Sequence, residues 1–236
     1  MPRRVQLILA LLAAQALTAA AAPILLLEYT FSTLQSGETG PGYNPTFVAT
    51  GLDASYNMAV RDTAGTITIE ISNPTPNYST QPVLRVDPDG NSSSLAQAVT
   101  NNKYWVFAFR PAANYVLDLD RLEFVAARGG GSTPRGWGLY SSADGYAAAI
   151  SSSALASQRP NWTSYVPSLS SSLFQGVDDP LTFRMYIYSP ADGSTIEFDN
   201  LRLYGEARLV PEPASLGLLG LGALSLVRRR ARRLPR

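Results

Sequence analysis

The chain has 236 residues and contains neither cysteine nor histidine. This excludes disulfides, cysteine nucleophiles, Ser-His-Asp triads, haem ligation by histidine and the usual zinc and copper sites. The formal net charge of +1 hides a split: residues 22–210 hold 11 of the 19 basic and 17 of the 18 acidic side chains, a net charge of −6. An acidic body without a basic run argues against nucleic-acid binding, which needs clustered positive charge.

The first 21 residues predict a signal peptide. Two arginines precede an apolar run over residues 5–17, and small residues, mostly alanine, follow it. This pattern is typical of a secretory signal and is too short for a stable membrane span. Cleavage after Ala21 or after Ala20 suits the small residues, and a retained signal anchor is the alternative. We therefore expect the body to be exported.

The body reads as β-strands separated by turns. Polar and apolar residues alternate over residues 66–71, 104–110 and 181–188. A period of two with one apolar face predicts half-buried strands. Breakers such as Asp-Gly and Gly-Gly recur between these runs, and an Asp-Gly turn is expected over residues 141–146. The stretches most like helices, residues 94–99 and 147–157, are short and weakly amphipathic.

Many short strands with glycine- and proline-rich turns are typical of a sandwich or a barrel. We predict an all-β domain over residues 22–205, a two-sheet antiparallel sandwich resembling a jelly roll. Residues 206–210 are predicted to form a short connector to the C-terminal segment, residues 211–236.

The C-terminal segment predicts a membrane anchor. Pro211, Glu212 and Pro213 precede a charge-free stretch that begins at Ala214 and ends at Val227. An arginine cluster follows, made of Arg228, Arg229, Arg230, Arg232 and Arg233. Arginines beside an apolar span stay in the cytoplasm, so the body would lie on the other side of the membrane. Fourteen residues reach about 21 Å as a helix. A comfortable span takes about 20 residues, so we expect a short transmembrane helix that holds the chain only briefly.

The Pro-Glu-Pro tripeptide, the apolar stretch and the terminal arginines together resemble the PEP-CTERM sorting domain of Gram-negative bacteria. The resemblance implies that an exosortase recognises the tail. Processing near Pro-Glu-Pro would then send the protein to the cell envelope or the extracellular matrix. An ordinary C-terminal tail anchor is the alternative.

The body also resembles the exported β-sandwich domains that often precede such tails. The segments that carry this resemblance are residues 104–109, 114–119, 135–137, 141–146 and 196–201. They describe a scaffold, and the resemblance implies no catalytic set.

Asp87, Asp89 and Asn91 offer three oxygen side chains at alternate positions. Calcium takes several hard oxygen ligands, so the loop is a candidate metal site. It is not an EF-hand, because Ser92 and Ala98 replace the required glycine and glutamate. The alternative is an ordinary turn built on Pro and Asp-Gly.

Without histidine, a hydrolase in this chain would depend on carboxylates, as glycosidases do. Glu70, Glu123, Glu197 and Asp199 lie on predicted strands. The polar side of an alternating strand explains them equally well. We therefore predict that the protein is not an enzyme, with a carboxylate-dependent glycan hydrolase as the alternative.

Aromatic side chains near loops suit sugar stacking. Trp137 and Trp162 are the candidates, with Arg135 as a hydrogen-bond donor to sugar hydroxyls. The alternative is that these rings fill the core, as tryptophan does in sandwiches, and Trp105 is expected there.

Together these features predict an exported, non-enzymatic envelope or matrix protein with a structural or adhesive role. A carbohydrate-binding module is the main alternative. The expected partners are the secretion machinery, an exosortase, the inner membrane and, for the alternative, a polysaccharide. No cofactor is expected apart from calcium at the Asp87 loop.

Overall fold

The computed structural model describes residues 22–31, 42–72, 82–156 and 161–210. The predicted signal peptide (1–21) and the sorting and anchor segment (211–236) lie outside the described residues. Among the helices in the described part of the chain, none combines the length and apolar character needed to cross a bilayer.

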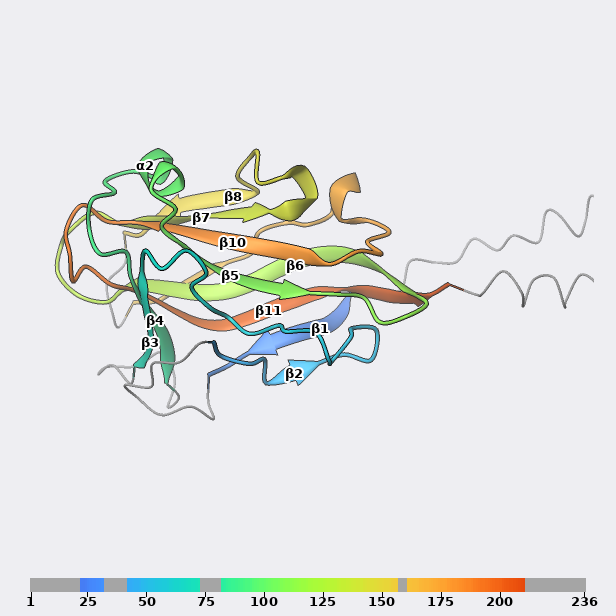
Figure 1. Ribbon diagram of the computed structural model, residues 1–236. Coiled ribbons are helices and arrows are strands. Elements are labelled where there is room, and N and C mark those ends of the chain that lie inside the picture. The colour runs from blue at the N-terminus through green and yellow to red at the C-terminus, as the bar shows by residue number, and fades with distance from the viewer. Residues whose placement is uncertain (1–21, 32–41, 73–81, 157–160, 211–236) are drawn as a thin grey trace, which may run out of the picture.

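Two antiparallel sheets form the two layers of the molecule (Figure 1). The larger sheet contains the chain's first and last strands. In the order β2-β1-β11-β4-β3, its members are Phe47–Val48, Ile24–Tyr29, Ile196–Leu209, Val83–Asp87 and Thr68–Ser72. It continues beyond β11 through β6 (Tyr115–Arg128) to β9 (Thr163–Tyr165).

The smaller sheet has the order β5-β10-β7-β8, with bounds Tyr104–Phe109, Leu181–Tyr188, Gly136–Ser141 and Ser151–Ala154. Two short 3-10 turns are η1 (Ser142–Asp144) and η2 (Ser172–Phe174). Helix α2 (Leu95–Thr100) begins after Ser94, whose hydroxyl accepts the Gln97 N–H at 3.3 Å. This serine cap explains a helix that the weak apolar pattern only suggested.

The core lies between the sheets, and aromatic rings from both layers meet there. The Trp105 ring of β5 lies edge-on to the Phe198 ring of β11 at 5.4 Å, and Phe124 of β6 meets Trp137 of β7 at 5.0 Å. Large rings of this kind bury much apolar area and prefer edge-to-face packing. The predicted all-β sandwich with two antiparallel sheets is therefore confirmed.

The predicted connector over residues 206–210 was wrong. β11 continues to Leu209, and its last residues pair with β6 as far as Tyr115. Ala207 faces inward and packs closely on Gly51, where an added Cβ would lie 2.1 Å from the Ala207 Cβ. Arg208 faces outward and forms an ion pair with Asp118. Strand pairing, the Ala207 contact and the Arg208 ion pair therefore keep β11 in the sheet to Leu209, two residues before the predicted tail.

Candidate functional site

Arg135, predicted to meet a ligand, is instead buried, with 2% of its surface exposed. Its guanidinium donates to three backbone carbonyls, those of Thr133, Gly130 and Thr195, at 3.1, 2.5 and 2.5 Å. Burial lowers the pKa of Arg135, and nearby Arg128 lowers it further. The side chain fastens the turn before β7 to the residue before β11, so the ligand role is corrected to a structural one.

Trp137 is also a core residue, with 1% of its surface exposed. Its ring lies between Phe124 at 5.0 Å and Tyr165 at 4.9 Å, both edge-to-face. A ring enclosed in this way offers no face to a sugar, which corrects the predicted stacking role. Trp105 is buried as expected. Trp162 is half-buried next to the start of β9, and its ligand role stays a prediction.

The candidate calcium loop gains a member from a distant part of the chain. Oxygens of Asp87, Asp89 and Asp192 all lie within 4.8 Å of one another. Asn91 carries an amide rather than a carboxylate, and its ligand role stays a prediction. Asp192 is a turn residue just before β11, and it is brought to the loop by the pairing of β4 with β11 and by the bridge between Ser92 and Ser189. The cluster can offer a cation three carboxylates, all but Asp87 exposed.

Backbone geometry holds these carboxylates together. Asp89, Gly90 and Asn91 all have φ between 52° and 67°. The Asp89 N–H donates to the Asp87 carboxylate at 3.0 Å. A Cβ on Gly90 would lie 2.9 Å from the Asp192 nitrogen, so the two turns touch here because residue 90 is glycine. Burial, with the negative charges of Asp89 and Asp192, raises the pKa of Asp87.

The carboxylates considered for hydrolysis do not all converge. Glu70 and Glu197 lie on strands either side of β4 and both oppose Arg85, beside a polar pocket of about 250 Å³. The Arg85 guanidinium binds Glu70 at 2.8 Å. Glu123 lies elsewhere, opposite Arg202 on β11. Asp199 is buried and accepts the Asn200 N–H.

The outer face of the smaller sheet carries an unexpected cluster, here called the tyrosine–arginine face. It contains Tyr104 of β5, Tyr140 of β7, Tyr186 and Arg184 of β10, and Tyr146 from the turn after η1. Strand register explains it, because Tyr186 lies opposite Tyr104 and Arg184 lies opposite Tyr140. Helix α2 covers one end of this face, where Leu95 packs on Gly138.

Arg184 lies between two rings of this face. Its guanidinium carbon is 4.5 Å from the centroid of Tyr104 and 3.7 Å from that of Tyr146. Its Nη1 donates to the Tyr186 hydroxyl at 3.3 Å. Within the described residues, Arg184 has no carboxylate partner. The guanidinium is thus oriented by tyrosines, with its charge available to an anion.

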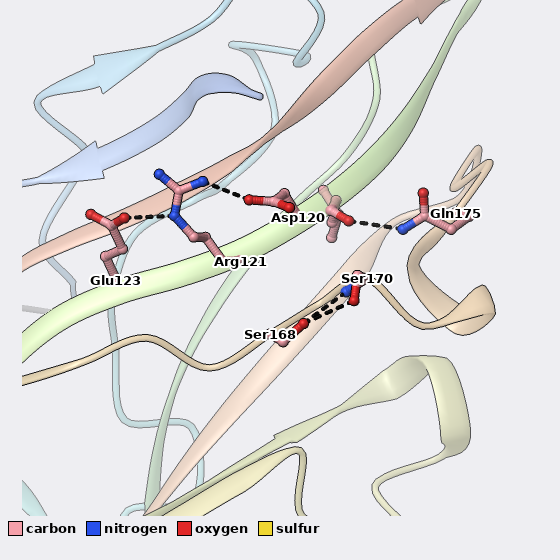
Figure 2. Close-up of polar contacts among 7 residues, drawn as sticks. Asp120, Arg121, Glu123, Ser168, Ser170 and Gln175 are labelled. Carbon is pink, nitrogen blue, oxygen red and sulfur yellow. Dashed lines mark hydrogen bonds and ion pairs between the residues drawn. The ribbon is translucent and has the colours of Figure 1, made fainter. Parts of the chain in front are cut away.

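A second arginine–tyrosine pair lies on the larger sheet, and its arginine does have carboxylate partners. Arg121 lies over the Tyr204 ring at 4.1 Å. Its guanidinium donates to Asp120 and to Glu123, each at 2.6 Å. Figure 2 shows the guanidinium between these two carboxylates. Those two carboxylates neutralise the cation.

A polar pocket of about 220 Å³ lies next to Asp120. Ser170 and Gln175 line it, and the Gln175 amide donates to the Leu119 carbonyl at 2.8 Å (Figure 2). Ser170 and Ser168 are 2.9 Å apart through their hydroxyls. The Gln175 amide thus bonds to the backbone, and the two serines bond to each other.

An open pocket of about 500 Å³ lies at the end of the sandwich where β11 ends. The pocket and the charges beside it form the exit face, whose residues are Asp53, Arg110, residues 111–116, Asp178 and Val210. Arg110 forms an ion pair with Asp53.

Sequence reasoning missed both Asp192 and the tyrosine–arginine face. The tyrosines stand at polar positions of alternating strands, which is a visible signal, but their meeting depends on the order β5-β10-β7. That order cannot be read from alternation alone.

Comparison with known families matches residues 209–233 to a PEP-CTERM protein-sorting motif. The predicted recognition of the tail is thereby confirmed, and such a motif marks an exported protein processed by an exosortase. Comparison with curated proteins gave no match.

Among solved structures, the CBM22-1 xylan-binding domain of Paenibacillus barcinonensis Xyn10C has 13% identity and a TM-score of 0.43, covering 79% of this chain and 97% of that domain. The K1 cleaved adhesin domain of Lys-gingipain from Porphyromonas gingivalis has 11% identity and a TM-score of 0.40, with 78% and 98% covered. Neither likeness identifies a ligand for this chain.

Proposed function

We propose that this is an exported, non-enzymatic β-sandwich protein that its tail sorts through the inner membrane to the cell envelope or extracellular matrix. Its role there is structural or adhesive. The observation that carries the proposal is the sorting motif at residues 209–233. The basic and apolar start of the chain supports the same route, because it has the pattern of a secretory signal.

The order of the tail supports a body that faces the periplasm. The arginines after Val227 stay in the cytoplasm, and the apolar stretch before them enters the bilayer. The stretch is short for a span, which suits a segment that is held and then removed. The protein is therefore anchored only until the exosortase acts.

The state of the carboxylates supports a scaffold more than an enzyme. Glu70 binds Arg85 and Glu28 binds Arg202 across neighbouring strands, and Glu123 binds Arg121 two residues away on β6. A catalytic pair would instead flank a cleft with separated pKa values. The first two ion pairs join strands on the surface of the sheet.

Fractionation of cells tests the sorting. Deletion of residues 211–236 should release the body into the periplasm. Replacement of the arginines at 228–233 by glutamine should impair retention and processing, because the cytoplasmic stop is lost. Arg208→Gln, in the body, is the matched control and should leave both unchanged. Unchanged fractionation in both tail variants would contradict the proposal.

The tyrosine–arginine face favours a second candidate function, carbohydrate binding by the exported body. Tyr104 and Tyr186 are buried, so the half-buried Tyr140 and Tyr146 are the rings of this face that can pack on the apolar face of a sugar. An arginine without a carboxylate partner can bind the anionic groups of an acidic polysaccharide. The single observation behind this candidate is Arg184, fixed between Tyr104 and Tyr146.

Retention of residues 22–210 on immobilised polysaccharides tests this candidate. Arg184→Ala and Tyr146→Ala should reduce retention on an acidic polysaccharide. Arg121→Ala and Tyr204→Ala remove the neutralised pair on the other sheet and should not. Equal retention of all four variants, or no retention of the unaltered body on any polysaccharide, would end the carbohydrate-binding reading.

A further inference from the structure

The folded body and the sorting motif share residues. The motif begins at residue 209, and Leu209 still pairs with Tyr115 in the sheet. The next N–H, that of Val210, donates to the Asn114 carbonyl at 2.7 Å. Among the described residues, the last hydrogen bond along the chain is therefore made directly before Pro211.

Only residues 211–213 separate Val210 from the first apolar residue, Ala214. An extended chain advances at most about 3.6 Å per residue, so Val210 and Ala214 are at most about 14 Å apart. The headgroup layer on one side of a bilayer takes up roughly 5–8 Å of that length. With the apolar stretch anchored in the bilayer, as proposed above, the end of the sandwich lies within about 10 Å of the membrane surface.

This space is no wider than a single helix with its side chains, about 10–12 Å. A membrane enzyme that acts on residues 211–213 cannot place a folded layer there without touching the body. We infer that the exit face docks directly on the membrane-embedded sorting enzyme while the tail is processed. The other end of β11 is remote, because the strand crosses the length of the sandwich (Figure 1).

The chemistry of the exit face indicates what it meets. Asp53 and Arg110 neutralise each other, whereas Asp178 of the exit face and the next residue, Asp179, are exposed and take part in no ion pair within the described ranges. Val210 of the exit face and the preceding residue, Leu209, expose 45% and 63% of their surface. Acidic and apolar groups together fit a protein surface with basic and apolar side chains. Anionic lipid headgroups would be repelled, so the surface favours the enzyme over the bilayer itself.

The competing route is that the end of β11 detaches and lengthens the tail. Residues 206–209 would then leave β6, breaking the ion pair between Arg208 and Asp118 and the contact of Ala207 with Gly51. The two routes differ when the end of β11 is fixed to β6. Docking predicts that the tail is still removed, and detachment predicts that its removal is blocked.

Charge reversal of the full-length chain tests docking, in cells that contain the sorting enzyme. The double variant Asp178→Arg with Asp179→Arg should slow tail removal by about tenfold or more, because like charges meet. Ala96→Arg with Thr100→Arg adds two positive charges at exposed positions of helix α2, at the other end of the sandwich, and should leave the rate unchanged. An insert of about eight Gly and Ser residues after Val210 should rescue the first variant, since it adds about 15 Å of reach. Equal rates in the Asp178/Asp179 variant and the α2 variant would overturn the docking surface.

A disulfide across the last strand pair tests detachment. The chain has no cysteine of its own, and Val116 lies opposite Arg208 in the ladder. Opposed residues in an antiparallel pair are about 4.5–5.5 Å apart, which a disulfide can bridge. Docking predicts that Val116→Cys with Arg208→Cys is processed equally fast oxidised and reduced. A block confined to the oxidised form would overturn docking in favour of detachment. Absence of tail removal from the unaltered chain would instead contradict the proposed sorting.

Discussion

The guanidinium carbon of Arg184 lies 3.7 Å from the centroid of the Tyr146 ring. Tyr146 reaches this position with a φ of 63°, directly after Gly145 with a φ of 69°. Its N–H donates to the Ser141 carbonyl at 2.8 Å, which closes the turn. A residue with a side chain seldom adopts this left-handed conformation, and it costs of order 1 kcal/mol or more. The contact with Arg184 offsets that cost.

Replacement of Tyr146 should therefore reverse the usual order of alanine and glycine. Both remove the ring, but glycine also relieves the positive φ. We expect Tyr146→Gly to be more stable than Tyr146→Ala by about 0.5–1 kcal/mol in chemical denaturation. At Tyr140, inside β7, the same pair of substitutions should show alanine as the more stable. Alanine equal to or better than glycine at position 146 would show that the turn carries no strain.

Arg135 should behave as a structural residue. Arg135→Met keeps most of the stem but leaves three inward-facing carbonyls without their donor. We expect a loss of roughly 3 kcal/mol in the free energy of unfolding. Arg208→Met, an exposed arginine on β11, should cost no more than about 1 kcal/mol. A stable Arg135→Met variant with weakened polysaccharide retention would restore the ligand role that burial argues against.

The sequence predicted the strands better than their arrangement. Alternation at Ile69 and Ile71, or at Trp105, Phe107 and Phe109, reports which face of a strand points into the main core, because successive side chains point to opposite faces. Alternation contains no information on which strands pair with one another. The pairing of β1 with β11 joins Ile24 to Gly205, and no local pattern links residues so far apart.

The predictions of site residues were incomplete or wrong for the same reason. Asp87 and Asp89 are close in sequence and were found, whereas Asp192 joins them only through the fold. Trp137 and Arg135 flank Gly136 near a glycine-rich turn, which suggested exposure. Their burial follows from β9, which brings Tyr165 against Trp137, and from the Thr195 carbonyl that Arg135 binds. The end of β11 was missed because Gly205 and Arg208 interrupt its apolar pattern.

The raised pKa of Asp87 predicts how stability varies with pH. Burial is the main cause, with repulsion by Asp89 and Asp192, and Arg85 opposes it. Between the ordinary aspartate value and this raised value, the folded state binds more protons than the unfolded state. The free energy of unfolding therefore falls as pH rises through that window, and the charged carboxylate destabilises the fold at neutral pH.

Asp87→Asn should consequently stabilise the protein at pH 7. The asparagine oxygen can still accept the Asp89 N–H, so the turn is kept while the charge is removed. The gain should shrink as the pH falls through the raised pKa of Asp87, because the natural carboxyl is then neutral too. Denaturation curves at several pH values measure this, with Asp178→Asn on the exposed exit face as control. A gain that persists unchanged at acid pH would assign the effect to packing.

Calcium offers a second way to relieve the same repulsion. Three carboxylates whose oxygens lie within 4.8 Å form a partial set of hard ligands, and water would complete the coordination of an ion. We expect millimolar calcium to raise the midpoint of thermal unfolding, as weak extracellular sites with dissociation constants of about 10⁻⁴–10⁻³ M do. Asp192→Asn should remove most of that rise, because it takes away the ligand that the fold supplies from a distant turn. Asp178→Asn should keep it, since Asp178 lies on the exit face and is not among the clustered carboxylates. A rise that Asp192→Asn leaves intact, or one that magnesium reproduces in full, would show a general effect of divalent ions on an acidic protein.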